Sequence, residues 1–172
     1  TKVSDSGLEK VFKSLSAIAC SLQVLSLYLG NTRISDSSIK VLSKEMLPWR
    51  AKLTSFTLEI SATQVSDSGL SKLFTAMMNE AKNIKTLSLY LAALKIGDKS
   101  IETLAKTLMP NMIGLESLTL NLSHTKIKDS GLVELLNNMG KGVLENLKSF
   151  SLSLSGTKVS DVTVHALNKQ LY

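Results

Sequence analysis

An aspartate recurs along this chain at an almost constant interval. Each copy stands in the phrase Val/Ile-x-Asp, is followed three residues later by Leu, Ile or Val, and lies 31 or 32 residues from the next. The six copies are Asp5, Asp36, Asp67, Asp98, Asp129 and Asp161. A period of roughly 20 to 50 residues that runs through a whole chain is typical of a repeat array. The chain is therefore predicted to fold as a stack of similar units.

Each repeat has two halves with different apolar periods. From Leu25 to Leu29, apolar residues alternate with polar or aromatic ones, which is the two-residue period of a half-buried strand. After the aspartate, Ile101, Leu104 and Leu108 follow the spacing of an amphipathic helix. One repeat is thus predicted to be a strand, a turn and a helix. Because all strands then run in the same direction, the sheet is parallel and the helices are its crossovers.

These residues carry a family resemblance. The phrase L-x-x-L-x-L-x-L-x-x-T-x-I-x-D-x-G-L at 115–132 resembles leucine-rich repeats of the ribonuclease-inhibitor type, and Val-Ser-Asp-Ser-Gly-Leu at 3–8 and 65–70 is similar to the cysteine-containing repeats of F-box proteins. Thr replaces the customary Asn or Cys, and the long unit looks similar to repeats of some single-celled eukaryotes. The resemblance implies an α/β leucine-rich repeat solenoid, a horseshoe with parallel β-strands on the concave face and α-helices on the convex face. It also implies a non-catalytic role.

The repeats divide one predicted domain, residues 1–172, into a leading partial unit and five full or nearly full units. The partial unit is 1–21, and the others are 22–52, 53–83, 84–114, 115–146 and 147–172. Solenoids need terminal units with a polar outer face, and neither end shows one. We expect a piece of a longer chain, or ends covered by further repeats or another subunit. Cys20 is the only cysteine, which favours a reducing, cytoplasmic compartment.

The aspartates are expected to cap the helices that they begin, where a carboxylate complements the helix dipole. Carboxylates stacked about 5 Å apart repel one another, so each needs local compensation. A basic residue three positions earlier supplies it in every repeat except that of Gln64. This basic rim consists of Lys2, Arg33, Lys95, Lys126 and Lys158. It is interpreted as charge balance or, alternatively, as a surface for an acidic protein, anionic lipid or nucleic acid.

A threonine column marks the turn after each strand. Its members are Thr32, Thr63, Thr125 and Thr157, with Leu94 as the exception. A hydroxyl here is expected to bond backbone groups that are freed where the sheet ends. Leu94 is expected to mark a locally different turn.

Side chains between the strand leucines are predicted to face outward on the concave face. The candidate protein-binding residues there are Ser26, Tyr28, Thr57, Glu59, Ser88, Tyr90, Thr119, Asn121, Ser151 and Ser153. Tyr28, Glu59 and Tyr90 form the expected centre, because aromatic residues are favoured anchors and the tyrosines lie two strands apart, roughly 10 Å. The alternative is a solvated sheet whose hydroxyls bond one another and water.

Catalytic motifs are absent from the sequence. His124 and His165 occupy unrelated repeat positions, no serine lies in G-x-S-x-G, and no phosphate-binding loop of the P-loop type occurs. No apolar run approaches the ~18 residues that span a bilayer. We therefore predict no enzymatic activity, no metal, no cofactor and no transmembrane segment.

Three functional hypotheses stay open. The first is a protein-binding or scaffolding module that acts through the concave face, the basic rim or both. The second is anionic-ligand binding through the basic rim, although only 5% of the residues are aromatic, which disfavours nucleic acid. The third is the recognition domain of a larger enzyme, such as a ubiquitin ligase.

Overall fold

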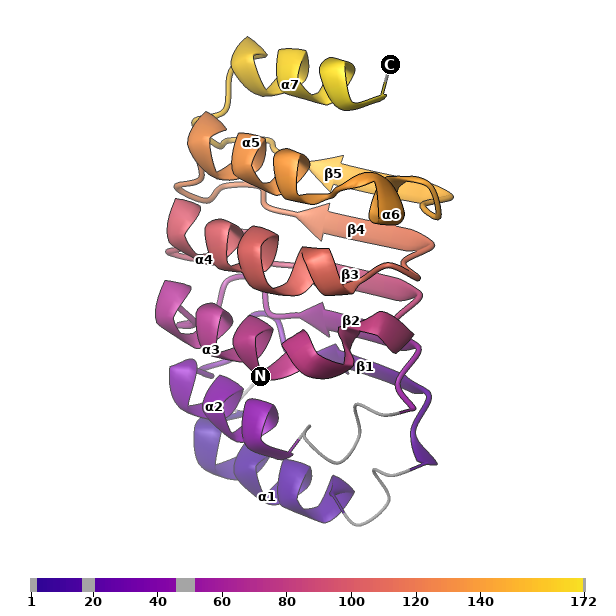
Figure 1. Ribbon diagram of the computed structural model, residues 1–172. Coiled ribbons are helices and arrows are strands. Elements are labelled where there is room, and N and C mark those ends of the chain that lie inside the picture. Colours follow the sequence, from indigo (N-terminus) through magenta and orange to yellow (C-terminus); the bar gives the residue numbers. More distant parts are fainter. Residues whose placement is uncertain (1–2, 17–20, 46–51, 172) are drawn as a thin grey trace.

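A single parallel sheet forms one side of the molecule. The computed structural model describes residues 3–16, 21–45 and 52–171, so Lys2 and Cys20 lie outside the described residues. The strands are β1 (Val24–Tyr28), β2 (Ser55–Glu59), β3 (Thr86–Tyr90), β4 (Ser117–Asn121) and β5 (Ser149–Ser153), and their spatial order follows the sequence (Figure 1). Equivalent repeat positions pair throughout, as in Leu25 with Phe56 and Leu87 with Leu118.

Helices cover the other side of the sheet (Figure 1). They are α1 (Asp5–Leu15), α2 (Asp36–Glu45), α3 (Asp67–Met77), α4 (Asp98–Thr103), α5 (Asp129–Asn138), α6 (Lys141–Leu144) and α7 (Asp161–Leu171). The predicted succession of strand and helix is confirmed. The stack of helices extends past the sheet at both ends in Figure 1, and the sheet forms the face opposite the helices, which is the face predicted to be concave.

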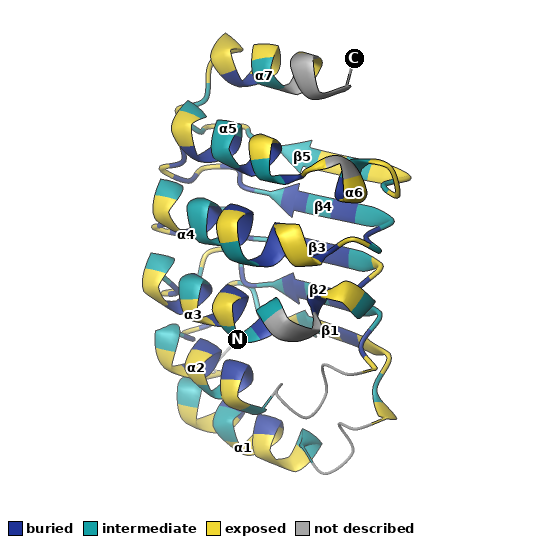
Figure 2. Cartoon of the chain, viewed as in Figure 1, coloured by how far each residue is buried: buried dark blue, intermediate teal, exposed yellow. Residues whose placement is uncertain are grey.

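The core lies between the sheet and the helices (Figure 2). Strand residues such as Leu87 and Leu89 have no exposed surface, and neither do Ile101, Leu104 and Leu108 of the predicted helical stripe. Both apolar periods therefore predict the buried faces correctly.

The helices depart from regular α-geometry in two repeats. After α3, residues Met78–Asn83 form a 3₁₀ helix. After α4, residues Leu104–Leu108 form a π-helix and Met109–Asn111 a 3₁₀ turn. Pro110 has no amide with which to continue the α-helical ladder, so the backbone changes its hydrogen-bond pattern there. The single extra residue of the 32-residue repeat falls between Asp129 and Leu147, the stretch that contains α6.

The turn after each strand has one conformation in all five repeats. Its first residues, Asn31, Ala62, Ala93, His124 and Gly156, all have φ between 53° and 68°. The next residue is the column threonine, whose hydroxyl donates to a carbonyl three residues earlier, at 2.6 Å from Thr32 and 2.7 Å from Thr125. The predicted role of the threonines is confirmed. The prediction of a different turn at Leu94 is wrong, because Ala93 has the same positive φ and Leu94 packs into the core with 2% exposure.

The aspartates connect each repeat to the following one. Each helix begins with its aspartate, but the carboxylate accepts hydrogen bonds from the start of the next helix. Asp67 accepts from the amides of Gly97 (3.1 Å) and Ser100 (3.2 Å) and from the Ser100 hydroxyl (2.7 Å). Asp5, Asp36, Asp98 and Asp129 make the equivalent inter-repeat contacts. The prediction that each aspartate caps its own helix is corrected: it caps its neighbour's.

In α2, α3, α4, α5 and α7, the third residue is small because the aspartate of the preceding repeat reaches it. Ser38, Ser100 and Thr163 donate hydroxyl hydrogen bonds to that carboxylate. Gly69 and Gly131 leave room for it instead, since a Cβ on Gly69 would lie 2.4 Å from Asp36 Oδ1. The preference for a small residue at this repeat position is therefore explained by a contact between neighbouring repeats.

Candidate functional site

The ten predicted concave-face residues form two rows across the sheet. One row pairs Ser26, Thr57, Ser88, Thr119 and Ser151 in register, and the other pairs Tyr28, Glu59, Tyr90, Asn121 and Ser153. Adjacent strands are spaced by about 4.8 Å, so the rings of Tyr28 and Tyr90 start from backbone positions about 10 Å apart. The structure brings the predicted residues onto one surface.

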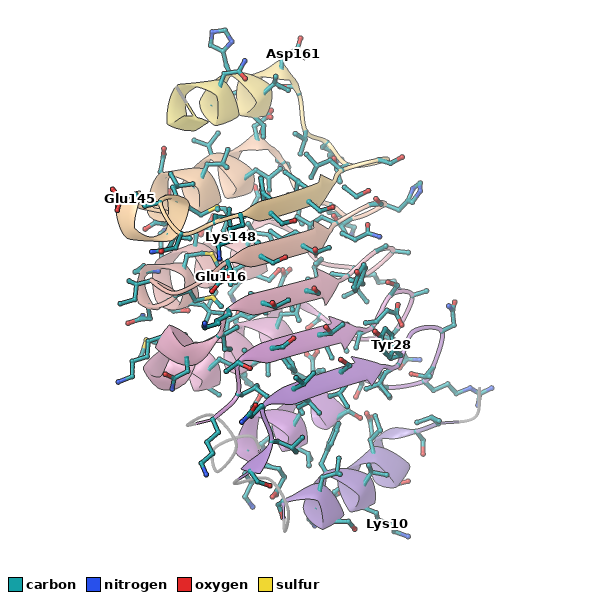
Figure 3. The ribbon with its side chains drawn as sticks, turned by 90° about the vertical axis from the view of Figure 1, so that its right-hand side faces the viewer. Lys10, Tyr28, Glu116, Glu145, Lys148 and Asp161 are labelled. Atoms are coloured by element: carbon teal, nitrogen blue, oxygen red, sulfur yellow. The ribbon has the colours of Figure 1, made fainter. Side chains whose placement is uncertain are left out.

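Tyr28 is the most prominent side chain of this surface. It is 72% exposed and lies at the carboxyl end of β1 (Figure 3), whereas Tyr90 is half-buried. Val24 lies on the same face of β1, four residues before Tyr28, and is 57% exposed. Val24 was not among the predicted binding residues, although its position next to an unpaired sheet edge would have indicated exposure. The apolar and aromatic surface is thus concentrated on β1.

Glu59 and Asn121 turn toward the backbone. The Glu59 carboxylate accepts from the amides of Gly30 (2.7 Å) and Ser61 (3.1 Å), and a Cβ on Gly30 would lie 2.3 Å from Glu59 Oε2. Asn121 Oδ1 accepts from the amide of Ser123 at 3.1 Å. Among the five residues of this row, only Tyr28 is exposed, and the other four are half-buried.

The remaining concave-face residues are short and uncharged. Ser26 and Ser151 are exposed, Thr57 and Thr119 are half-buried, and Ser88 at the centre is 9% exposed. Further along the strands, the hydroxyls of Ser123 and Ser153 bond each other at 2.8 Å. Such a surface offers short hydrogen-bonding groups with little side-chain entropy to lose on binding.

An ion-pair cluster lies at the amino-terminal ends of the strands. Glu116 contacts Lys85 at 3.3 Å and Lys148 at 2.7 Å, and Figure 3 shows Glu116 beside Lys148. Hydrogen bonds from Lys148 and Lys85 lower the pKa of Glu116. The sequence pattern did not reveal this cluster. In the sequence, Lys85, Glu116 and Lys148 stand out only as residues that directly precede three successive strands.

The described members of the basic rim are exposed to solvent. Arg33, Lys95, Lys126 and Lys158 are exposed, and among these residues and the described aspartates no ion pair is found. The described rim residues therefore do not compensate the aspartates through direct ion pairs. Amides and hydroxyls of the next helix stabilise the carboxylates instead, and they lower the pKa of Asp129 to about 2. At Asp5, burial acts to raise the pKa, but hydrogen bonds from Ser38 and Ser35 outweigh it.

Near the middle of the rim lies a cavity of about 290 Å³. Thr63, Gln64, Val65, Ser66 and Lys95 line it. It coincides with the repeat in which Gln64 replaces a basic residue, so the positive rim is interrupted there.

The described residues hold no cluster of three or more metal-ligating side chains. His124 lies against Gly156 in a turn, whereas His165 lies on α7. Within the described part of the chain, no helix has the length and apolarity to cross a bilayer.

Comparisons with known proteins gave a match to a family model and a similarity to a solved structure. A family model described as "Leucine Rich repeat" matches residues 115–136. Among solved structures, the chain is similar to an internalin from Listeria monocytogenes, with 18% identity, a TM-score of 0.39 and coverage of 90% of this chain and 48% of that one. The chain thus spans about half of that internalin's length. A search of curated proteins finds no match. The matched repeat and the in-register parallel sheet identify the fold as an α/β leucine-rich repeat solenoid.

Proposed function

We propose that this chain is a non-catalytic protein-binding or scaffolding module whose concave sheet face contacts the partner. Leucine-rich repeat proteins generally act as protein-binding scaffolds, and solenoids use their extended concave surfaces for this purpose. The helix on the convex side of each repeat supports the ribonuclease-inhibitor subtype.

The observation that carries the proposal is the exposure of Tyr28, which is 72% exposed on a face of short hydroxyl side chains. Tyrosine buries a large area at low entropic cost and is enriched among the residues that dominate binding energy. The half-buried Tyr90 lies in the same row, two strands away from Tyr28. A flat surface of this kind suits a protein or peptide better than an enclosed small molecule.

Two neighbouring features define the orientation of the partner. The Lys85–Glu116–Lys148 cluster borders the face at the amino-terminal strand ends, and the basic rim follows the carboxyl ends and the turns. A partner with acidic groups on either side of an apolar or aromatic centre complements this arrangement.

The test compares capture from cell extract by the intact chain, by a Tyr28→Ala/Tyr90→Ala variant and by a Lys10→Ala/Lys106→Ala variant on the convex side. With the identified partner in hand, the tyrosine variant is expected to lose at least about 30-fold in affinity, the effect of one or two dominant residues. The convex-side variant is expected to bind within about twofold. Equal binding by all three proteins would refute the concave-face proposal.

A second candidate function is binding of an anionic ligand through the basic rim. The observation that favours it is that Arg33, Lys95, Lys126 and Lys158 are exposed and free of ion pairs with the described aspartates. Binding through the rim should weaken steeply with salt, whereas binding through the tyrosines should not. Replacing the basic rim residues, including Lys2, by neutral residues distinguishes binding through the rim from binding through the tyrosines. The role of a recognition domain within a larger enzyme, such as a ubiquitin ligase, uses the same concave face.

A further inference from the structure

Lysines are concentrated on the rim of the last three repeats. The turns between the strands and the following helices are stacked along one edge of the molecule (Figure 1). In the repeats of β3, β4 and β5, these turns and the first helical residues contain five exposed lysines, the lysine patch: Lys95, Lys99, Lys126, Lys128 and Lys158. In the sequence, the equivalent positions of the three preceding repeats hold only two basic residues, Lys2 and Arg33. The positive charge of the rim is therefore uneven along the solenoid.

Two lysines of the patch occupy positions that do not favour a helix. Lys128 is the N-cap residue of α5 and makes no side-chain cap hydrogen bond, whereas the equivalent Ser66 accepts from the amide of Ser68. Lys99 is the second residue of α4, where the partial positive charge of the helix start disfavours a cation. Serine occupies both positions in the first three repeats and is a good cap. Helix stability therefore does not account for these two lysines.

The carboxylates of the same turns do not neutralise the patch by direct contact. Asp98 accepts from the amide of Lys128 at 2.8 Å, and Asp129 accepts from the amide of Ser160 at 2.9 Å. Asp161, at the far end of the patch, is exposed. No ion pair joins a lysine of the patch to an acidic residue that the structure describes. The five ammonium groups thus have no direct ionic partner within the described part of the chain.

A cavity of about 290 Å³ lies at the Lys95 end of the patch. Its lining residues are Thr63, Gln64, Val65, Ser66 and Lys95. The hydroxyl of Thr63 donates to a carbonyl of its own turn at 2.8 Å, and the hydroxyl of Ser66 donates to Asp36 at 2.6 Å. Both hydroxyl protons are therefore engaged. The side-chain donors that remain for an occupant are the amide of Gln64 and the ammonium of Lys95, and both residues are exposed.

The backbone beside the cavity offers one more donor. In the other described turns, the amide at the rim position donates to a carbonyl of the preceding repeat. These bonds join Arg33 to Val3 (3.2 Å), Gln64 to Ile34 (3.0 Å), Lys126 to Ile96 (2.9 Å) and Lys158 to Ile127 (3.0 Å). Among the described residues, the amide of Lys95 makes no such bond. The cavity is thus bordered by three donor groups, and an ionised carboxylate accepts several hydrogen bonds and donates none.

We propose that the lysine patch and this cavity are the docking site for an acidic peptide segment of a partner protein. One carboxylate enters the cavity and accepts from Gln64 and from the amide and ammonium of Lys95, and the carboxylates that follow pair with the other lysines. Lys95 and Lys158 belong to turns two strand spacings apart, about 10 Å, which about three residues of extended chain cover. A short acidic run therefore reaches the whole patch. The site belongs to the basic rim, so the proposal rests on the second candidate function, binding of an anionic ligand.

The chemistry of the rim favours a peptide over a nucleic acid or a lipid surface. Single-stranded nucleic acids are held by aromatic side chains that stack on the bases. No Phe, Tyr or Trp occurs in the rim segments 62–68, 93–99, 124–130 and 156–162. The cavity takes a group that projects from its carrier, as a glutamate side chain does, whereas lipid headgroups form a flat layer.

The test uses a fluorescein-labelled peptide with a run of glutamates, titrated with the full chain at low salt and followed by anisotropy. Saturable binding is expected. The patch variant carries Lys95→Gln, Lys99→Gln, Lys126→Gln and Lys128→Gln. The control variant removes the same charge from exposed positions on α1, α2 and α3, by Lys10→Gln, Lys40→Gln, Lys44→Gln and Lys72→Gln. The patch variant should bind at least about 30-fold more weakly, and the control variant should stay within about threefold. Equal weakening would overturn the proposal, because net charge alone would then attract the peptide.

A matched pair of single substitutions tests the cavity. Gln64→Glu and Ser68→Glu each add one negative charge near the same turn, but Ser68 is exposed on α3 and does not line the cavity. Gln64→Glu should weaken binding by about tenfold or more, because two carboxylates would share the cavity, and Ser68→Glu should stay within about threefold. Equal weakening by the two substitutions would mean that no carboxylate enters the cavity and would refute the proposed site.

Two other polyanions distinguish this proposal from the more general one. A fluorescein-labelled oligothymidylate and vesicles that contain phosphatidylserine are titrated in the same way, and both are expected to bind more weakly than the glutamate peptide. Tighter binding of either probe through the same lysines would retain the rim as an anionic-ligand site but refute the acidic peptide. Failure of all three probes to bind at low salt would refute both.

Discussion

An interior repeat and the last repeat have nearly the same sequence pattern but different surroundings. In the interior, Asp67 accepts three hydrogen bonds from the next helix start, and Leu70 is fully buried. In the last repeat, Asp161 is exposed and Val164 is 55% exposed. A repeat in this fold is therefore completed by the one that follows it. The consensus residues stabilise the chain only where that neighbour is present.

The largest expected effect comes from placing a charge at the third position after the aspartate. Leu132→Asp buries an unpaired carboxylate at a site with 1% exposure and should destabilise the chain by more than about 4 kcal/mol. Val164→Asp should change the free energy of unfolding by less than about 0.5 kcal/mol, as for other surface substitutions. Urea denaturation followed by circular dichroism measures both. A similar loss of stability in Leu132→Asp and Val164→Asp would contradict the proposed difference between an interior repeat and the last repeat.

Glycine at the third helix position gives the next largest contrast. Gly69→Ala places a Cβ 2.4 Å from Asp36 Oδ1 and should cost about 1–3 kcal/mol through overpacking. Gly7 has the same repeat position in α1, but a Cβ there would meet nothing within 4 Å. Gly7→Ala should be neutral or should stabilise the chain by up to about 1 kcal/mol through helix propensity. If the urea midpoint falls equally in both variants, contact between repeats does not explain the glycine.

Removing the carboxylates themselves should have a smaller effect. Asp67→Ala leaves the amides of Gly97 and Ser100 without their acceptor and should cost about 1–2 kcal/mol. Asp161→Ala removes a carboxylate that no described residue contacts and should be close to neutral. Thermal unfolding of the two variants distinguishes them, and equal melting temperatures would show that the inter-repeat hydrogen bonds add nothing.

The pH dependence of the free energy of unfolding should reveal the same hydrogen bonds between an aspartate and the next repeat. The pKa of Asp129 is lowered to about 2 from an ordinary value of 3.8, mainly by the amide of Ser160 and the hydroxyl of Thr163. Because the folded pKa lies below the unfolded one, this stabilisation is complete above about pH 4 and is lost as the pH falls toward 2. Asp129→Asn should flatten the stability curve in that window. Superimposable curves for wild type and Asp129→Asn would contradict the assignment.

The sequence predicted the repeat boundaries, the parallel sheet and the buried faces, because each rests on a local period. It did not predict the partner of the aspartates, since a residue that begins a helix appears in sequence to cap that helix. The contact from Asp67 to Gly97 joins residues 30 positions apart, and only the stacking geometry brings them together. The turn at Leu94 was mispredicted for a related reason: its conformation depends on Ala93 and the sheet register, not on the missing hydroxyl.

The candidate surface was predicted in composition but not in detail. Alternation placed Tyr28 and Tyr90 on one row, as observed. It could not show that Glu59 turns back to the amide of Gly30, or that Glu116 holds two lysines, because both depend on side-chain conformation across strands. The proposed binding surface is therefore narrower than the set of residues that the sequence pattern indicated.

Residue-resolved amide hydrogen exchange of the unliganded chain tests most directly that each repeat is completed by the next. The account predicts slow exchange at Leu122, whose amide donates to Ser153, and exchange at least about 100-fold faster at Phe150 and Leu152 on the open edge of β5. Ser151, whose amide faces β4, serves as the control within the same strand and should be slower than its two neighbours. Protection of Phe150 and Leu152 equal to that of Leu122 would contradict the account, because it would mean that the last repeat is already closed.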